Sequence, residues 1–169
     1  QDINLRASQA SSEQGMVMAD AGRDVNLMAG QNYQFADEAH KVTGGNGMFS
    51  KTTRTTRDTL SETTAQGSTL SGEHTYVQGG RDINLQGANV VSSQQTILVA
   101  GNDVNIAAAR DSRSERHDKT EKTSGLFSGG GIAVTVGTQE QRVKDMTTST
   151  TAVASTVGST EGDVLIEAG

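Results

Sequence analysis

Aspartate and asparagine recur at fixed places in one short phrase, Asp-[Ile/Val]-Asn-[Leu/Ile], and their type and spacing could support chemistry. A column of outward carboxylates built from Asp24, Asp82 and Asp103 would suit a polysaccharide lyase or hydrolase, because such enzymes cluster charged side chains on one outer face. Asn and Asp also recur at turns and in stacked ladders for backbone reasons that need no substrate. We therefore predict no catalytic residue and no enzyme activity, and we keep a carbohydrate-active enzyme as the alternative.

The sequence contains no set of residues spaced for a metal or a cofactor. Calcium-binding β-rolls need a Gly-Gly-x-Gly-x-Asp motif in every nonapeptide, and the run Gly79–Asp82 does not recur at that spacing. His40, His74 and His117 form no His-x-x-x-His pair, and the chain has no cysteine. The glycine run at 129–131 lacks the Gly-Lys-Ser/Thr of a phosphate loop. We predict neither a metal site nor a bound cofactor.

The phrase itself is an internal repeat, with copies that begin at Asp2, Asp24, Asp82, Asp103 and, in degraded form, Asp163. The intervals alternate between short and long: 24 − 2 = 22, 82 − 24 = 58, 103 − 82 = 21 and 163 − 103 = 60. Every second copy is therefore near eighty residues away, as in 82 − 2 = 80. Such a period, with one supersecondary unit per repeat, predicts a solenoid in which each coil buries its apolar face against its neighbours.

Within each phrase, apolar and polar residues alternate, so the two kinds of side chain point to opposite faces of a strand. Two further short β-type runs follow the phrase at Asp82, namely Asn89–Val91 and Thr96–Gly101, and we expect them to form two separate strands because polar residues lie between them. We predict a narrow core from the apolar positions Ile3, Leu5, Val25, Leu27, Ile83, Leu85, Ile97, Val99, Val104, Ile106, Val164 and Ile166. On the outer face we predict a polar ladder, because stacked asparagines hydrogen-bond along a fibre axis; its members are Asn4, Asn26, Asn84 and Asn105.

The composition agrees with a thin core better than with an ordinary globular one. Only 33% of the 169 residues are hydrophobic and 3% are aromatic, and the mean hydropathy is −0.49. A narrow core can be filled by a few Val, Ile, Leu and Ala residues per coil without large aromatic side chains, because backbone hydrogen bonds between coils keep the structure regular. We predict an all-β parallel solenoid over residues 1–169, as a single segment of a longer repeat array.

Two insertions interrupt the repeat, at about residues 31–66 and 108–152. The second contains Ser124–Ser128, which resembles Asn46–Ser50 in the first, so the insertions belong to the repeat. Their threonine-rich, polar sequences favour extended hairpins that leave the solenoid.

Two details of the insertions lead to further predictions. The alternating run Gly129–Gly137 predicts a strand. The rare aromatics Phe49 and Phe127 occupy equivalent positions, and we expect them to pin each insertion to the coil.

The charge pattern indicates no partner of a particular class. The net charge is −6 and the sequence pI about 5.0, which gives no general footprint for nucleic acid or for an anionic membrane. Acidic residues accompany the basic clusters at 51–57 and 110–119. No apolar run approaches twenty residues, so we expect neither a membrane span nor a signal peptide in this stretch.

With these motifs in view, the chain resembles the haemagglutinin repeats, of the second repeat class, in filamentous-haemagglutinin-like two-partner-secretion exoproteins. The resemblance rests on Gly162–Gly169, which reads Gly-Asp-Val-x-Ile-x-Ala-Gly, and on the run Ser124–Gly137. The first insertion departs from it, since Lys51–Arg54 stands where the glycine run is expected. This family includes adhesins and the effectors of contact-dependent growth inhibition.

The resemblance implies a right-handed parallel β-helix in a filament secreted to the bacterial cell surface. Such a filament serves target-cell binding, or delivery of a carboxyl-terminal toxin into a neighbouring bacterium. The implied partners are neighbouring repeats of the same chain, a target-cell surface or outer-membrane component, and an outer-membrane transporter.

Overall fold

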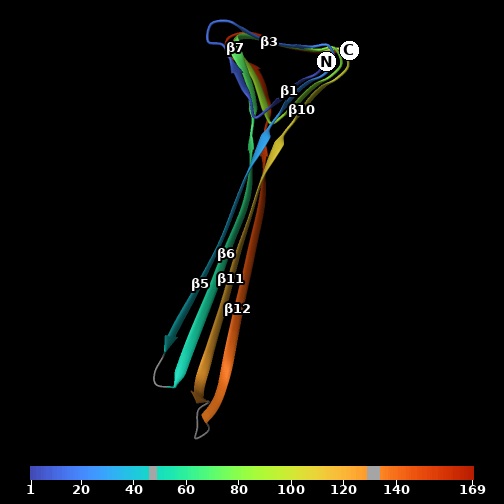
Figure 1. Cartoon of the computed structure of the whole chain (residues 1–169). Coiled ribbons are helices and arrows are strands. Elements are labelled where there is room, and N and C mark those ends of the chain that lie inside the picture. Colours follow the sequence, from blue (N-terminus) through green and yellow to red (C-terminus); the bar gives the residue numbers. More distant parts are fainter. Residues whose placement is uncertain (46–48, 129–133) are drawn as a thin grey trace. The chain divides into compact units, whose positions relative to one another are not determined.

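The computed structural model describes residues 1–45, 49–128 and 134–169 (Figure 1). All regular structure in these residues is β-strand, so the predicted all-β class is confirmed. The chain divides into two compact units. The first unit contains residues 1–32, 63–112 and 150–169, and the second contains 33–62 and 113–149.

In the first unit, the strands build two parallel sheets. The strands are β1 (Ile3–Arg6), β2 (Gln9–Ser11), β3 (Met16–Ala21), β4 (Val25–Met28), β7 (Ser68–Gly79), β8 (Ile83–Gln86), β9 (Ala88–Ala100), β10 (Val104–Ala107), β13 (Thr156–Ser159) and β14 (Val164–Ala168). We call each phrase strand, with the strands of the other sheet that follow it, a coil. There are four coils in the described residues: β1–β2–β3, β4–β7, β8–β9 and β10–β13–β14.

The first sheet contains the phrase strands in the order β1-β4-β8-β10, all parallel. Its register aligns equivalent phrase residues, so that Leu5 pairs with Leu27, Leu27 with Leu85, and Leu85 with Ile106. Because side chains alternate along a strand, this register stacks the apolar positions on one face and the asparagines on the other.

The second sheet is built around two long strands, β7 and β9, which pair in parallel. The shorter strands β2 and β3 pair with β7, and β13 and β14 pair with β9. The sequence predicts two separate short strands between Asp82 and Asp103, whereas β9 is continuous and the irregularity lies opposite it, between Gly72 and His74 of β7.

The core lies between the inward faces of these two sheets. Its fully buried large side chains are Val25, Leu27, Leu70, Val77, Ile83, Leu85, Val90 and Leu98. Ile3, Leu5 and Val104 of the predicted core are partly buried and pack against this cluster. Thr75 and Thr96 are buried with it, and their hydroxyls donate to the carbonyl oxygens of Val91 (2.8 Å) and Gly158 (2.7 Å).

For β9 the prediction has the wrong parity. We expected Ile97 and Val99 in the core, but Leu98 is fully buried and Ala100 is buried, while Ile97 and Val99 lie on the outer face and are partly exposed. The physical reason is that Ile97-Leu98-Val99 is apolar at every position, so the run carries no alternation to show which residues point inward.

Three further residues of the predicted core are about half exposed: Ile106 at 47%, Val164 at 43% and Ile166 at 45%. Ile106 belongs to β10, the last strand of the first sheet, and Val164 and Ile166 belong to β14, which pairs only with β9 in the described residues. No strand in the described part of the chain covers the far side of this fourth coil, which explains their exposure.

Asp163–Ile166 is not a fifth copy of the phrase strand. Its strand, β14, lies in the second sheet, where Val164 pairs with Thr96 and Ile166 with Leu98. Strands of both sheets alternate apolar and polar residues, so the degraded motif could not be assigned to one sheet by its pattern alone.

The second unit is a four-stranded sheet in the order β12-β11-β6-β5 (Figure 1). Its strands are β5 (Gly30–Gly45), β6 (Ser50–Gln66), β11 (Ala109–Ser128) and β12 (Val134–Val153), whose first or last residues extend into the first unit. β5 and β6 come from the first insertion and β11 and β12 from the second, so the two hairpins lie side by side through β6 and β11 (Figure 1).

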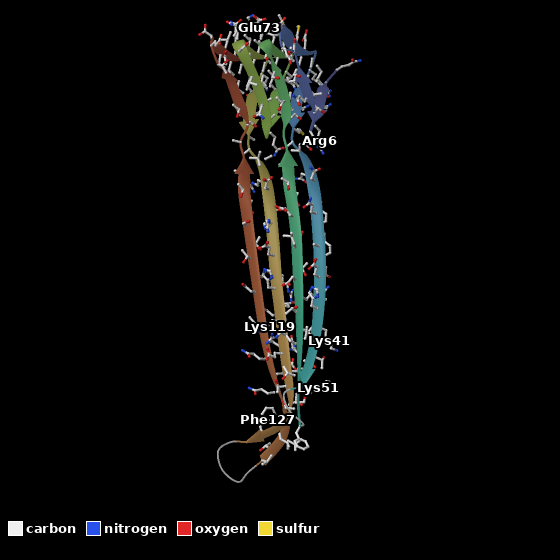
Figure 2. All side chains as sticks on the ribbon, turned by 90° about the vertical axis from the view of Figure 1, so that its left-hand side faces the viewer. Arg6, Lys41, Lys51, Glu73, Lys119 and Phe127 are labelled. Atoms are coloured by element: carbon white, nitrogen blue, oxygen red, sulfur yellow. The ribbon has the colours of Figure 1, made fainter. Side chains whose placement is uncertain are left out.

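Parts of both hairpins lie outside the described residues. The resemblance between Asn46–Ser50 and Ser124–Ser128 and the expected strand Gly129–Gly137 fall partly on residues 46–48 and 129–133. Phe49 and Phe127 belong to the second unit, and Phe49 is 67% exposed, so the expectation that they pin the insertions to the coil is wrong. Figure 2 shows Phe127 near the hairpin ends of the four-stranded sheet. Lys41, Lys51 and Lys119 lie on the same sheet.

Candidate functional site

The four phrase asparagines form a continuous hydrogen-bonded ladder on the outer face of the first sheet. Asn26 Nδ2 donates to Asn4 Oδ1 at 2.8 Å, Asn84 Nδ2 to Asn26 Oδ1 at 2.8 Å, and Asn105 Nδ2 to Asn84 Oδ1 at 3.0 Å. These are the four residues of the expected polar ladder. Their side-chain amides bind one another along the stacking direction, which is a structural use that needs no ligand.

A second column, of charged residues, stands at the corner that precedes each phrase. Arg23 forms two hydrogen bonds to the Asp2 carboxylate (2.8 and 2.5 Å), and Arg81 forms two to Asp24 (2.9 and 2.6 Å). Each arginine therefore reaches back to the aspartate of the previous coil. The bidentate hydrogen bonds from Arg23 hold the pKa of Asp2 below its usual range.

Asparagine takes the place of arginine in the next step of the column. Asn102 Nδ2 donates to Asp82 Oδ1 at 3.0 Å and to Asp103 Oδ2 at 2.9 Å. The hydrogen bond from Asn102, with the charge of Arg81, lowers the pKa of Asp82. Asp24 and Asp82, two of the carboxylates considered for polysaccharide chemistry, are thus bound to neighbouring coils, and Asp103 accepts from the adjacent Asn102. The lowered pKa of Asp82 suits an ion-pair acceptor rather than a general acid.

The three histidines have different surroundings. His117 Nδ1 lies 2.8 Å from Asp58 Oδ1, His40 Nε2 lies 3.9 Å from Glu38 Oε2, and His74 is exposed on β7. No group of three or more His, Cys, Asp or Glu side chains suited to a metal ion occurs within residues 1–45, 49–128 and 134–169. In the same ranges no helix is long and apolar enough to cross a membrane.

The outward face of the second sheet carries an apolar row that the sequence did not lead us to expect. The register aligns Met18 with Tyr76, Tyr76 with Ile97, and Ile97 with Leu165 across β3, β7, β9 and β14. Met18 is 56% exposed and Leu165 is 49% exposed. The Tyr76 hydroxyl donates to Gln78 Oε1 at 2.7 Å. The row arises because β9 has the opposite parity to the one predicted, which turns Ile97 outward.

In the second unit, the basic clusters are paired with carboxylates across the strands. Arg57 forms two hydrogen bonds to Asp37, at 2.9 and 2.5 Å, and Arg54 Nη2 lies 3.1 Å from Glu121 Oε2. Lys122 Nζ lies 3.0 Å from Glu140 Oε2. In these contacts the positive charge is locally balanced by carboxylates, as on a mixed-charge surface.

His117 is surrounded by carboxylates from three strands of this sheet. It comes from β11 and faces Asp58 of β6 and Asp145 of β12, with Glu115 on its own strand. The hydrogen bond to Asp58, together with the charges of these carboxylates, raises the pKa of His117 above its usual value. When it is protonated, the ring forms an ion pair with Asp58 of β6, and the charge of Asp145 on β12 also favours the protonated form.

We expect Asp58→Asn to lower the pKa of His117, because the variant loses the carboxylate to which the imidazole is hydrogen-bonded. Since the folded-state pKa is raised, the stabilising contribution is fully present below the unfolded value of about 6.5 and is lost as the pH rises through the folded pKa. Imidazole proton shifts followed by NMR from pH 5 to 9 measure the His117 titration in the unmodified chain and in the variant. An unchanged His117 titration in the variant would show that Asp58 is not its partner in solution.

Comparison with known proteins adds family information to this geometry. The Hemagglutinin repeat family matches residues 49–169. tRNA nuclease CdiA-2 of Burkholderia pseudomallei is 32% identical over 168 residues, covering 99% of this chain and 5% of that protein. tRNA nuclease CdiA of Escherichia coli (strain STEC_O31) is 37% identical over 161 residues, covering 92% and 5%. Deoxyribonuclease CdiA of Dickeya dadantii is 35% identical over 171 residues, covering 100% and 5%.

The chain therefore spans about a twentieth of the length of these relatives, 5% in each case. No solved structure shows a significant match.

Proposed function

Because the chain belongs to the Hemagglutinin repeat family, we propose that it is a structural and binding segment of a secreted bacterial surface filament. Its first unit is a right-handed parallel β-helix, one segment of a longer repeat array with two hairpin insertions. The segment serves target-cell adhesion, or the delivery of a carboxyl-terminal toxin in contact-dependent growth inhibition. The observation that carries the proposal is the in-register stack of phrase strands with its asparagine ladder.

The names of the relatives support a role without catalysis. They are called tRNA nuclease, 16S rRNA endonuclease and Deoxyribonuclease, yet all three kinds match this chain over 88% or more of its length in the examples from Escherichia coli, Enterobacter cloacae and Dickeya dadantii. A segment shared by proteins with different nucleic-acid substrates is not the part that selects the substrate. We infer that this chain is a scaffold and holds neither a catalytic residue, a metal nor a cofactor.

We propose three kinds of partner for this segment. Neighbouring repeats of the same chain extend the coil, because the half-exposed Ile106 and Ile166 present an apolar end to which another coil can bind. The filament meets a target-cell surface or an outer-membrane component, and it reaches the cell surface through an outer-membrane transporter.

A chimera tests the scaffold role in a working protein. In tRNA nuclease CdiA-2 of Burkholderia pseudomallei, this chain would replace the 168-residue stretch that it matches. We expect the chimera to reach the cell surface and to inhibit the growth of neighbouring cells as the unmodified protein does. A matched chimera carrying Leu27→Asp and Leu85→Asp, which put charges into the core, should lose surface display. A well-displayed first chimera with no effect on neighbours would contradict an interchangeable scaffold.

The carbohydrate-active alternative has its own experiment. The purified chain is incubated with a panel of acidic polysaccharides, and new reducing or unsaturated ends are measured. We expect none, because Asp24, Asp82 and Asp103 are held by the corner column. Cleavage that disappears on Asp82→Asn and Asp103→Asn would establish the enzyme instead.

A further inference from the structure

We propose that the outer edge of β12 is the docking edge for the first strand of the next repeat's hairpin. The four-stranded sheet would then grow by one hairpin for each repeat of about eighty residues. The occupant is a hairpin of the same kind, whose first strand runs antiparallel to β12 and carries charges opposite to those of β12. This adds an interaction surface to the proposed filament, and its test is independent of adhesion and of toxin delivery.

The contact already made inside the chain is the first observation. Each hairpin follows a phrase strand of every second coil: β5 begins after β4, and β11 after β10. The second strand of the first hairpin, β6, pairs with the first strand of the second hairpin, β11. β5 and β12 are the two edges of the sheet, and neither has a partner on its outer side among the described residues. Long edges of this kind favour pairing with another strand.

Side-chain contacts define the register between the two hairpins. Thr52 lies opposite Thr123, with 3.2 Å between their Oγ1 atoms. The next contacts along β6 are Arg54 with Glu121 at 3.1 Å, Asp58 with His117 at 2.8 Å and Glu62 with Arg113 at 3.6 Å. Every step forward on β6 is matched by an equal step back on β11, as in an antiparallel pair, and every charged contact joins opposite signs.

The coils show which residues of the outer edges correspond to these. Thr69 of β7 and Thr156 of β13 both pair with Asn89. The chain therefore enters the second sheet at the same place after β6 and after β12. Asp58 and Asp145 both lie eleven residues before these threonines. β12 therefore presents a carboxylate at the position from which β6 binds His117.

The first strands of the two hairpins, β5 and β11, can be aligned in the same way. Leu27 and Ile106 both pair with Leu85, and Glu38 and His117 both lie eleven residues after these residues. In the same register, the β5 of a following copy would place Glu38 opposite Asp145. By the same count, Lys41 would lie opposite Arg142.

The backbone of β12 is thus suited to a following hairpin. A strand with the sequence of this chain's own β5, however, would place two like-charged pairs opposite one another, Glu38 with Asp145 and Lys41 with Arg142. Like charges directly opposite one another destabilise a strand pair. The charges therefore select the partner, and they disfavour association of free copies through these edges. The matching hairpin carries a basic residue at the position of Glu38 and an acidic residue at the position of Lys41.

A tandem duplication of the whole chain tests the inference. Joining Gly169 to Gln1 of a second copy gives Gly-Gln-Asp, which has the spacing of Gly101-Asn102-Asp103 and so continues the repeat. Two tandems are compared: one unmodified, and one with Glu38→Lys and Lys41→Glu in the second copy. The chain has no cysteine, so an engineered pair can report the contact without interference.

The reporting pair is Ser149→Cys in the first copy and Gln34→Cys in the second, which occupy the positions of Glu62 and Arg113 in the known contact. The reference pair, Thr52→Cys with Thr123→Cys, lies in that known contact. In the charge-changed tandem we expect disulfide formation in a yield similar to the reference, and in the unmodified tandem at least a several-fold lower yield. No disulfide in the charge-changed tandem, or equal yields in both tandems, would overturn the proposal.

A third pair separates this inference from the proposed β-helix. Asn105→Cys in the first copy and Asn4→Cys in the second would continue the asparagine ladder across the junction, as Asn84 and Asn26 do inside the chain. If this ladder pair forms while the hairpin pair fails, the coil continues and only the hairpin inference is overturned. If the ladder pair fails, the repeat array of the proposed function is contradicted as well.

Discussion

Leu85→Ala is expected to lower the free energy of unfolding by about 2 to 5 kcal/mol, as truncation of a fully buried leucine does. Leu85 is 1% exposed and pairs with Leu27 on one side and Ile106 on the other. The core is a narrow column between two sheets, so few other side chains can move into the space that the substitution leaves. Urea denaturation followed by circular dichroism measures the change.

Ile106→Ala is the matched control, because Ile106 occupies the same place in the next phrase strand but is 47% exposed. We expect it to cost about half as much or less, since part of its apolar surface is in contact with water in the folded state. Equal losses at the two positions would show that the fourth coil is covered in solution. A loss below about 0.5 kcal/mol, as at surface sites, for Leu85→Ala would show that the column is not the core.

The phrase strands could be predicted because their alternation has only one parity. In Asp-Ile-Asn-Leu, burial of the apolar residues forces Asn84 outward, and the same pattern recurs in each coil. The run Ile97-Leu98-Val99 has no such signal, and its parity is set by the partners of β9 across the second sheet. Thr96 illustrates the difficulty. As a polar residue it would be predicted to point outward, but it is buried because its hydroxyl donates a hydrogen bond to the Gly158 carbonyl oxygen.

The hairpins could be expected from the sequence, but the pairing between them could not. Their strands are polar on both faces, so hydrophobic alternation says nothing about which edge meets which. The information lies in charge pairs far apart in the chain, such as Arg54 with Glu121 and Asp58 with His117. Such pairs are found only when a register is already assumed. The sequence alone therefore shows only that acidic residues accompany the basic clusters.

Gly87→Ala is expected to destabilise the fold by about 1 to 3 kcal/mol through its left-handed backbone conformation, and the clash of the new Cβ adds to this cost. Gly87 has φ +58°, in the left-handed region, and a Cβ there would lie 2.5 Å from the Ala109 Cβ. Ala7 stands at the same corner of the first coil with φ 47°, so Ala7→Gly removes such strain and should be neutral or stabilising by up to about 1 kcal/mol. Urea denaturation compares the two variants. Since both changes exchange alanine and glycine at one kind of corner, shifts of the same sign would contradict a left-handed requirement there.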